Sequence, residues 1–443
     1  MKKIKSALVF IFIFFFASTS FCCTIVSCSR NGKAFAAANE DDYISTLYAR
    51  IWFNPPTKDR YGTVCFGLSD LQAQAIMNEY GLFVDCTAQN TIDPAKVNLK
   101  NPYLGDLLFE ILGKCKNVKE AIEFLKTHEY ALYSCQALLA DAEGNSVVIN
   151  AGVQVMKEGN YQINTNFNIS DLKRGITDRR YDIANEMLQS GTDVSVPYLK
   201  TILDRTHQEG NLTTLYSYVF DMKKGLIYVY FFHNFDNAYV IDIKKELKKG
   251  YRLENLADSF TLSYAYESFI KKDPGYKKEV ILSEIYKKGL DVTVAHYLSL
   301  LNTPIQKDST LKTQKDSLLK MRKDSALRMT MLEVGLQLVK DAYNRHAQGA
   351  MWLYWFSLPD GYTVSTFKDE RLDAAKNIFE CLKKQEPFDA KLKNFVTEID
   401  AYVSLVQGKN EEAKTLYKSA SANRDDTYPV SYDRAKEMLT RIN

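Results

Sequence analysis

The first half of the chain is dominated by short runs in which apolar and polar positions alternate. Alternation with a period of two predicts β-strands. It does so at residues 24–29, 34–39, 50–53, 63–68, 136–141 and 146–150. Two later runs, 215–220 and 226–232, are joined by a short polar segment and predict a hairpin, and residues 238–243 predict one more strand.

Helical patterns interrupt these strands. Apolar residues recur at spacings of three and four in residues 104–112 and 118–125, and again in residues 181–188. This spacing gathers apolar side chains on one face of a helix. The combination predicts a domain of sheets that carry helices, over residues 23–256.

Beyond about Leu256 the strand pattern stops and helical periodicity continues. We expect a helical connector at residues 257–330 and a further helical region at residues 331–443. Within the connector, the triplet Lys-Asp-Ser recurs at residues 307, 315 and 323 in a highly charged stretch. Such a stretch is typical of an exposed helix or connector.

The last region contains two imperfect copies of a helical-hairpin pattern. Their positions are Ala375, Phe379, Leu382 and Pro387 in the first copy, and Gly408, Glu412, Ala413, Tyr417 and Ala420 in the second. The alanines lie 38 residues apart (413 minus 375), near the tetratricopeptide period of about 34. The pattern predicts a tetratricopeptide-like region, which serves either as a surface for a protein partner or as a packing collar for the preceding domain.

The chain begins with the pattern of a secretory leader. Lys2, Lys3 and Lys5 precede an apolar run at residues 7–17, and small polar residues follow. The run is about half of the roughly 20 residues that span a bilayer. We therefore expect residues 1–22 to be a signal peptide and the protein to be exported to the periplasm or the cell surface. No later segment is apolar for long enough to predict a membrane span.

Composition removes several classes of function. A chain of 443 residues with 46% apolar residues can bury a large core. The formal net charge is only +3 and is not gathered into a basic block, so we expect no nucleic-acid partner. The eight cysteines include no CxxC pair, and the five histidines, at positions 128, 207, 233, 296 and 346, are scattered. Neither a metal site nor a cofactor is expected.

Cys23 is the residue that follows the expected leader. Ser20 and Cys22 supply small residues at the third-last and last positions before it. Cleavage after Cys22 gives Cys23 a free α-amine, so that one residue holds both a thiol nucleophile and a base. The reference pKa is about 7.7–8.0 for the amine and about 8.5 for the thiol. At neutral pH a fraction of the amine is therefore unprotonated and a fraction of the thiol is ionised. Such a catalyst needs no histidine.

A leader that ends at a cysteine is also the mark of lipid attachment. Ser20 and Phe21 fit a lipobox poorly if Cys22 is the acylated residue, because the residue before it is not small. The two fates exclude each other: lipid on Cys23 blocks the sulfur, and lipid on Cys22 denies Cys23 a free amine. The alternative is therefore a surface lipoprotein with an inactive first domain and a partner-binding helical half.

The Asn-Gly pair at residues 31–32 lies between two alternating segments and predicts a two-residue hairpin turn. Pairing residue 30 with residue 33 places Cys23 opposite Glu40. Strict alternation then puts Glu40 on the face of Cys23 and Asp41 on the other face. Asp41 can reach the site only from the strand end or through a bulge.

Several motifs follow one another over residues 23–256. They are Cys23-Thr24-Ile25-Val26, Gly32-Lys33, Ala38-Asn39-Glu40-Asp41, Met77-Asn78-Glu79-Tyr80-Gly81-Leu82, the segment 137–149, Asn164-Thr165-Asn166-Phe167 and Arg179-Arg180-Tyr181. In order and spacing they resemble the linear-amide branch of the choloylglycine hydrolase and acyl-CoA:6-aminopenicillanic acid acyltransferase family.

The resemblance implies an α+β fold, a four-layer αββα sandwich of the N-terminal-nucleophile hydrolase type, acting on a small-molecule linear amide. Residue by residue, it implies Cys23 as the nucleophile, Asp41 as the carboxylate that holds the α-amine, Asn166 as an oxyanion donor and Arg180 as a supporting arginine, with a second donor near Thr87 and Ala88. Each preoriented oxyanion donor is worth about 2.7–4 kcal/mol.

Two positions depart from the bile-salt hydrolases of this family. Those enzymes carry an arginine just before the Asn-x-Asp motif, where this chain has Ala38, and a larger polar residue where it has Ala88. Penicillin-like, bile-salt, N-acyl amino acid and peptide-like amides all stay open as substrates. So does the choice between hydrolysis and acyl transfer, because water or an amine can capture the same acyl-enzyme.

Overall fold

The structure of the chain is a computed structural model. It describes residues 23–43, 48–69, 71–97, 99, 103, 106–191, 193–262, 266–267, 270–273, 275–302, 314–347, 364–385, 390–422 and 429–442. The expected signal peptide, the Lys-Asp-Ser triplet at 307 and Pro387 lie outside these residues.

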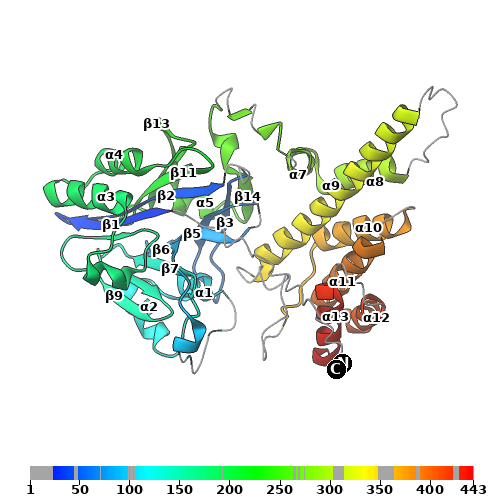
Figure 1. Cartoon of the computed structure of the whole chain (residues 1–443), viewed down its shortest axis with the longest axis horizontal. Coiled ribbons are helices and arrows are strands. Elements are labelled where there is room, and N and C mark those ends of the chain that lie inside the picture. Colours follow the sequence, from blue (N-terminus) through cyan, green and yellow to red (C-terminus); the bar gives the residue numbers. More distant parts are fainter. Residues whose placement is uncertain are drawn as a thin grey trace, which may run out of the picture.

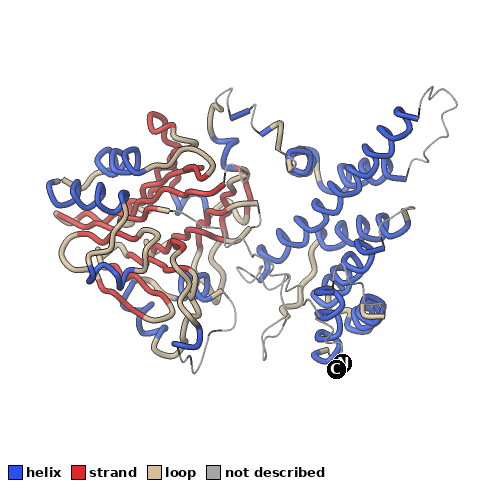
Figure 2. Tube along the Cα trace, viewed as in Figure 1, coloured by secondary structure: helices blue, strands red, loops and turns tan. Residues whose placement is uncertain are grey.

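Two antiparallel sheets build the first half of the chain (Figures 1 and 2). The six-stranded sheet has the order β10-β1-β2-β11-β12-β13, and the eight-stranded sheet the order β14-β3-β4-β5-β6-β7-β8-β9. The strands are β1 (Thr24–Arg30), β2 (Lys33–Tyr43), β3 (Arg50–Asn54), β4 (Thr63–Gly67), β5 (Ala73–Asn78), β6 (Phe83–Ala88), β7 (Cys135–Ala140), β8 (Ser146–Asn150), β9 (Val153–Met156), β10 (Tyr161–Asn164), β11 (Leu212–Asp221), β12 (Leu226–Phe231), β13 (Asn234–Asp242) and β14 (Arg252–Asn255).

Helices accompany the sheets and then make up the second half of the chain. In the first half they are α1 (Leu107–Lys114), α2 (Val118–Leu125), α3 (Arg179–Ser190), α4 (Val196–Thr206) and α5 (Ile243–Leu247). In the second half they are α7 (Tyr276–Lys288), α8 (Leu290–Asn302), α9 (Gln314–Ala347), α10 (Glu370–Lys384), α11 (Ala390–Val406), α12 (Asn410–Ala420) and α13 (Pro429–Arg441).

The two sheets stack face to face with helices on both outer sides (Figure 1). One apolar cluster lies between the sheets and joins small residues of β2, such as Ala36 and Ala38, to large ones, such as Phe66 and Tyr218. A second cluster joins the outer face of the eight-stranded sheet to α1 and α2. A third joins the outer face of the six-stranded sheet to α3 and α4. The first half is thus mixed α and β with two antiparallel sheets, as expected.

The β1–β2 hairpin has the register that the sequence predicts. Arg30 pairs with Lys33 and Thr24 with Asn39, which sets Cys23 opposite Glu40. The turn residues Asn31 and Gly32 have φ of 50° and 74°, the left-handed region that a two-residue hairpin turn requires.

The C-terminal helices form two apolar clusters of their own. The larger one gathers residues from α7, α8, α9, α10 and α11, and the smaller one residues from α11, α12 and α13. The Lys-Asp-Ser triplets at 315 and 323 lie in the single long helix α9. Tetratricopeptide-like character stays a prediction. No helix in the described ranges combines the length and hydropathy of a membrane span.

Polar contacts join the helices to the sheets. Arg50 of β3 forms an ion pair with Glu279 of α7, and both side chains are largely buried. The hydroxyl of Tyr251 donates to Oδ1 of Asp341 in α9 at 2.7 Å. The second half therefore packs on the edge of the eight-stranded sheet, where β14 lies.

Candidate active site

Cys23 lies immediately before β1 and is fully buried. Its Sγ lies 3.3 Å from Oε2 of Glu40 and donates to it. Glu40 follows Ala36 and Ala38 on β2 at alternate positions, and these alanines face the apolar cluster between the sheets. The thiol therefore lies in the space between the two sheets.

A second carboxylate lies close to this pair. The hydroxyl of Tyr218, on β11, is in hydrogen-bond contact with Oε1 of Glu40 and lies 2.7 Å from Oδ2 of Asp85, on β6. A hydroxyl has one proton to donate, so two ionised carboxylates cannot both be satisfied by it. One carboxyl group must carry a proton of its own.

The pKa directions agree with a shared proton. Burial raises the pKa of the Glu40 carboxyl, against the hydrogen bond from Tyr218, which lowers it. Burial and the charge of Glu40 raise the pKa of Asp85. Burial also raises the pKa of the Cys23 thiol, and the charges of Glu40 and Asp85 raise it further. The sulfur is thus held as a thiol by its surroundings.

Asp41 lies on the opposite face of β2, as alternation requires. Its Oδ2 accepts from Nε2 of Gln208 at 2.7 Å and lies 3.4 Å from Nη1 of Arg180. Its Oδ1 accepts a hydrogen bond from the hydroxyl of Thr214. Burial raises the pKa of Asp41 to about 7, while Thr214 and Arg180 act to lower it.

A β-bulge marks this point in the sheet. The pairing of β11 with β2 shifts between Thr214 and Tyr216, so that Thr214 lies opposite Asp41 and Tyr216 opposite Glu40. The bulge is on the partner strand rather than on β2. It aligns a hydroxyl donor with Asp41 and leaves the alternation of Glu40 and Asp41 intact.

Arg180 connects the expected site residues. Its Nη1 donates to the backbone carbonyl of Cys23 at 3.2 Å, and its Nη2 donates to Oδ1 of Asn166 at 2.6 Å. Asp178 caps α3 through the backbone N–H groups of Arg180 and Tyr181 and also lies 3.3 Å from Nη2. The structure therefore brings Cys23, Asp41, Asn166 and Arg180 together.

Two asparagines lie near the end of β10. Nδ2 of Asn166 donates to the backbone carbonyl of Ala88 at 2.9 Å. Asn164 pairs with Ile25 across β1, so its side chain shares the inner face with Ile25. Asn164 is fully buried, and its side-chain amide has no hydrogen-bond partner in the described part of the chain. Both are candidate donors to an oxyanion.

Sequence reasoning missed part of this arrangement. Asp85, Tyr218, Gln208 and Thr214 were not expected at the site, although Glu40 was placed on the face of Cys23. A usable signal was present for Asp85, because a carboxylate in the apolar run of β6 is costly to bury without a role. Tyr218 and Thr214 reach the site because β11 pairs with β2, and Gln208 reaches it from the loop between α4 and β11.

Comparisons with known proteins bear on this site. Residues 28–236 match the family model described as acyl-coenzyme A:6-aminopenicillanic acid acyl-transferase. The match confirms the resemblance over that range, which contains Asp41, Asn166 and Arg180 but begins after Cys23. No curated protein matches the chain.

Solved structures of low identity also resemble the chain. Two variants of a conjugated bile acid hydrolase from Clostridium perfringens are 13% and 14% identical, with TM-scores of 0.44 and 0.43; each comparison covers 55% of this chain and 99% of the other. A penicillin V acylase from Agrobacterium tumefaciens is 16% identical, with a TM-score of 0.41, over 53% of this chain and 92% of the other.

Proposed function

We propose that the part of this chain that matches the acyl-coenzyme A:6-aminopenicillanic acid acyl-transferase family acts, together with Cys23, as an exported cysteine amidohydrolase for linear amides. The observation that carries the proposal is the connection of Cys23 to Asp41 and Asn166 through Arg180.

In the proposed reaction, Sγ of Cys23 attacks the amide carbonyl carbon. A carbon–sulfur bond forms, and the thiol proton passes to the free α-amine and then to the leaving nitrogen. The carbon–nitrogen bond breaks and leaves a thioester on Cys23 and a free amine product. Water then adds to the thioester carbon, the carbon–sulfur bond breaks, and the carboxylic acid and the thiol are released.

Removal of residues 1–22 would place a positive charge where the surroundings are acidic. Glu40, Asp85 and Asp41 all act to raise the pKa of the Cys23 thiol. An α-ammonium group at Cys23 would oppose this effect, because a nearby cation favours thiolate over thiol. In the proposal, processing therefore supplies a free amine that takes the thiol proton, and the α-ammonium group that results stabilises the thiolate.

The processing step has a direct test. Intact-mass and N-terminal peptide analysis of protein recovered from its native envelope should find Cys23 as the unmodified first residue. A fatty-acylated N-terminus would instead support the alternative, a surface lipoprotein whose first domain is inactive. A chain that retains residues before Cys23 would contradict the proposed catalyst.

Acyl transfer is the second candidate function, and the family description favours keeping it. The same thioester can be captured by an amine in place of water. Product analysis with and without an added amine acceptor separates the two reactions. Acid as the main product in both samples supports hydrolysis, whereas a new amide formed in proportion to the acceptor supports transfer.

We also propose that the two sheets and their outer helices form an N-terminal-nucleophile αββα sandwich over residues 23–256. The helices beyond it act as a tetratricopeptide-like packing collar or as a surface for a partner. The substrate is a small-molecule amide, and neither a nucleic acid nor a cofactor takes part.

A further inference from the structure

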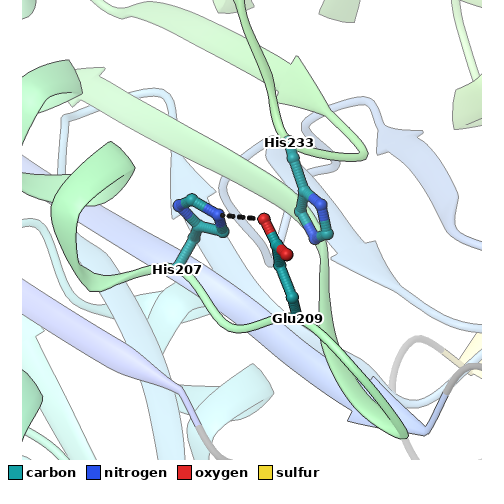
Figure 3. A group of neighbouring side chains, drawn as sticks. All are labelled: His207, Glu209 and His233. Atoms are coloured by element: carbon teal, nitrogen blue, oxygen red, sulfur yellow. Dashed lines mark hydrogen bonds and ion pairs between the residues drawn. The ribbon is translucent and has the colours of Figure 1, made fainter.

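Three side chains with metal-binding atoms meet at one end of the six-stranded sheet (Figure 3). His207 and Glu209 lie between α4 and β11, and His233 lies in the turn between β12 and β13. One ligand atom from each side chain lies within 4.8 Å of the other two. In Figure 3 the carboxylate of Glu209 lies between the two imidazole rings.

The first histidine is oriented as a ligand. Nδ1 of His207 is in hydrogen-bond contact with the backbone carbonyl of Asp204, and Nε2 lies 3.2 Å from Oε1 of Glu209. A hydrogen bond from one ring nitrogen to a carbonyl fixes the tautomer and leaves the other nitrogen's lone pair free for a metal. Nε2 is thus presented toward the carboxylate.

The second histidine is held by its turn and by a neighbour. Its Nε2 lies 3.0 Å from the hydroxyl of Thr213. Phe232 and His233 have φ of 47° and 63°. A two-residue hairpin turn with both residues in this region strongly prefers Asn-Gly. Phe232 and His233 thus adopt a backbone conformation that is unfavourable for their side chains. In this conformation the imidazole of His233 lies beside that of His207, with ring centroids 5.0 Å apart.

The distances suit a small metal ion after a modest movement. A tetrahedral Zn²⁺ with bonds of about 2.0–2.1 Å holds two of its ligand atoms about 3.4 Å apart. The ligand atoms of the present cluster lie within 4.8 Å of one another, so binding needs an approach of at most about 1.4 Å. The side chain of Glu209 is 74% exposed and free to make that movement.

We propose that His207, Glu209 and His233 bind a zinc-class transition-metal ion, with water completing its coordination. Two imidazoles and one carboxylate form a set that Zn²⁺ commonly uses. Ca²⁺ and Mg²⁺ prefer oxygen ligands and do not suit it. The spacing of the histidines in the sequence gave no sign of this cluster.

The metal would restrain the loop between α4 and β11, which contacts Asp41 through Gln208. Gln208, between two of the ligands, donates through Nε2 to Asp41, and its backbone N–H and C=O pair with the hydroxyl and the N–H of Thr214. A metal ion on the residues before and after Gln208 would fix this residue. The ion is therefore a positioning element for the candidate site and takes no part in bond breaking.

Zinc binding by the purified full chain tests the proposal without any substrate. After chelator treatment, titration calorimetry with Zn²⁺ should give one equivalent, and the melting temperature should rise as Zn²⁺ is added, because the ion binds the folded chain. Ca²⁺ and Mg²⁺ should do neither. Absence of Zn²⁺ binding would overturn the proposal.

Three variants assign the site, and one serves as a control. His207→Gln, Glu209→Gln and His233→Asn should each weaken Zn²⁺ binding more than about 100-fold, beyond the loss seen when only an outer-shell partner is removed. Asn tolerates the left-handed backbone at residue 233, and Glu209 is exposed, so the fold should be retained, as circular dichroism without metal would verify. His296→Gln, at an exposed position of α8, should bind as the parent does. Equal binding by all four variants would mean that these three residues do not hold the zinc, which would overturn the assignment.

Discussion

The thiol of Cys23 lies among acids rather than beside a histidine. Glu40 contacts it directly, and Asp85 is linked to Glu40 through Tyr218. In the present arrangement these groups keep the sulfur protonated, so a nucleophile here needs a nearby cation or base. A free α-amine on Cys23 would meet this need for a base or a cation.

The first prediction concerns this nucleophile. Cys23→Ala should abolish cleavage of any linear amide that the parent cleaves, because no sulfur is left to form the thioester. Cys23→Ser should lose nearly all activity, since a hydroxyl is a far weaker nucleophile beside the same amine. Iodoacetamide treatment of the parent should also block turnover. Near-full activity of purified Cys23→Ala would remove Cys23 from the mechanism.

A second prediction separates the two asparagines. Asn166→Ala should lower kcat by about a hundredfold to a thousandfold, because an oxyanion donor stabilises charge that develops in the transition state. The melting temperature should fall modestly as well, because Asn166 loses its hydrogen bonds to Arg180 and to the carbonyl of Ala88. Asn164→Ala is the matched comparison, since Asn164 precedes it by two residues and its amide is buried. If the large kcat loss occurs in Asn164→Ala instead, the donor is Asn164. A lower melting temperature with unchanged kcat would make Asn166 a structural residue.

The carboxylate beside the sulfur yields a prediction about pH. Because the charge of Glu40 raises the pKa of the Cys23 thiol, Glu40→Gln should lower that pKa. The rate of iodoacetamide labelling follows the thiolate, so its pH profile should move to lower pH, as measured by mass spectrometry of the Cys23 peptide. Glu186→Gln, at an exposed position of α3, should leave the profile unchanged. A profile that moves upward would contradict the placement of Glu40.

Single residues were predictable where the local pattern is strong. The Asn-Gly turn fixed the register that sets Cys23 opposite Glu40, and the motif order selected Asp41, Asn166 and Arg180. Asp85 and Tyr218 could not be joined to Cys23 in the same way. Their contacts depend on which strands of one sheet face which strands of the other. A single sequence does not show directly how the two sheets are aligned.

Strands were predicted best where apolar residues dominate the run, as in β1, β2, β7 and β8, which are buried on both faces for most of their length. The expected strands at 24–29, 34–39, 136–141 and 146–150 coincide with β1, β2, β7 and β8, and the expected helix at 118–125 coincides with α2. Strands β5 and β6 were missed because polar residues interrupt their apolar runs. Asn78 ends β5, and Asp85 and Thr87 lie within β6, and all three are buried. Strands β9 and β10 are only 4 residues long.

The N-cap of α3 also supports the side chain of Arg180, and mutation can separate these two roles. Asp178 caps the helix and contacts Arg180, whereas Ser195 caps α4 through Tyr198 alone. Asp178→Ala and Ser195→Ala should each cost about 1 kcal/mol of stability. Asp178→Ala should also lower kcat/KM by at least about tenfold, equivalent to ~1.4 kcal/mol, because the guanidinium loses a support.

Urea unfolding and steady-state kinetics on both variants decide this point. Equal kcat/KM in the two would mean that Asp178 acts only as a cap. A tenfold loss in Ser195→Ala as well would show that general destabilisation of the outer helices, and not the position of Arg180, limits the rate.

At the scale of the whole molecule, the sequence predicted two regions but not how they meet. Arg50 and Glu279 are separated by more than 200 residues (|i−j| = 229), and neither has a local pattern that selects the other. The cluster shared by α7 to α11 also extends across α9, which passes through residue 330. A deletion of residues 331–443 would cut this helix and expose the apolar faces of α7 and α8.

The last prediction tests whether the helical half is a collar for the sheets or an independent partner surface. The Arg50–Glu279 pair has side-chain exposures of 4% and 11%, so Glu279→Ala leaves a buried guanidinium without that partner. Removing one member of a buried pair costs about 3–5 kcal/mol. Asp193→Ala is the control, because Asp193 pairs with Lys33 at 62% and 48% exposure and such pairs are worth about 0–1 kcal/mol.

If the helices are a collar, Glu279→Ala should lower the urea midpoint of the sheet region markedly, as monitored by hydrogen exchange of β3 and β14, and Asp193→Ala should not. Unchanged exchange in β3 and β14 would mean that the sheets are stable without the helices, which would leave the partner surface as the role of the second half.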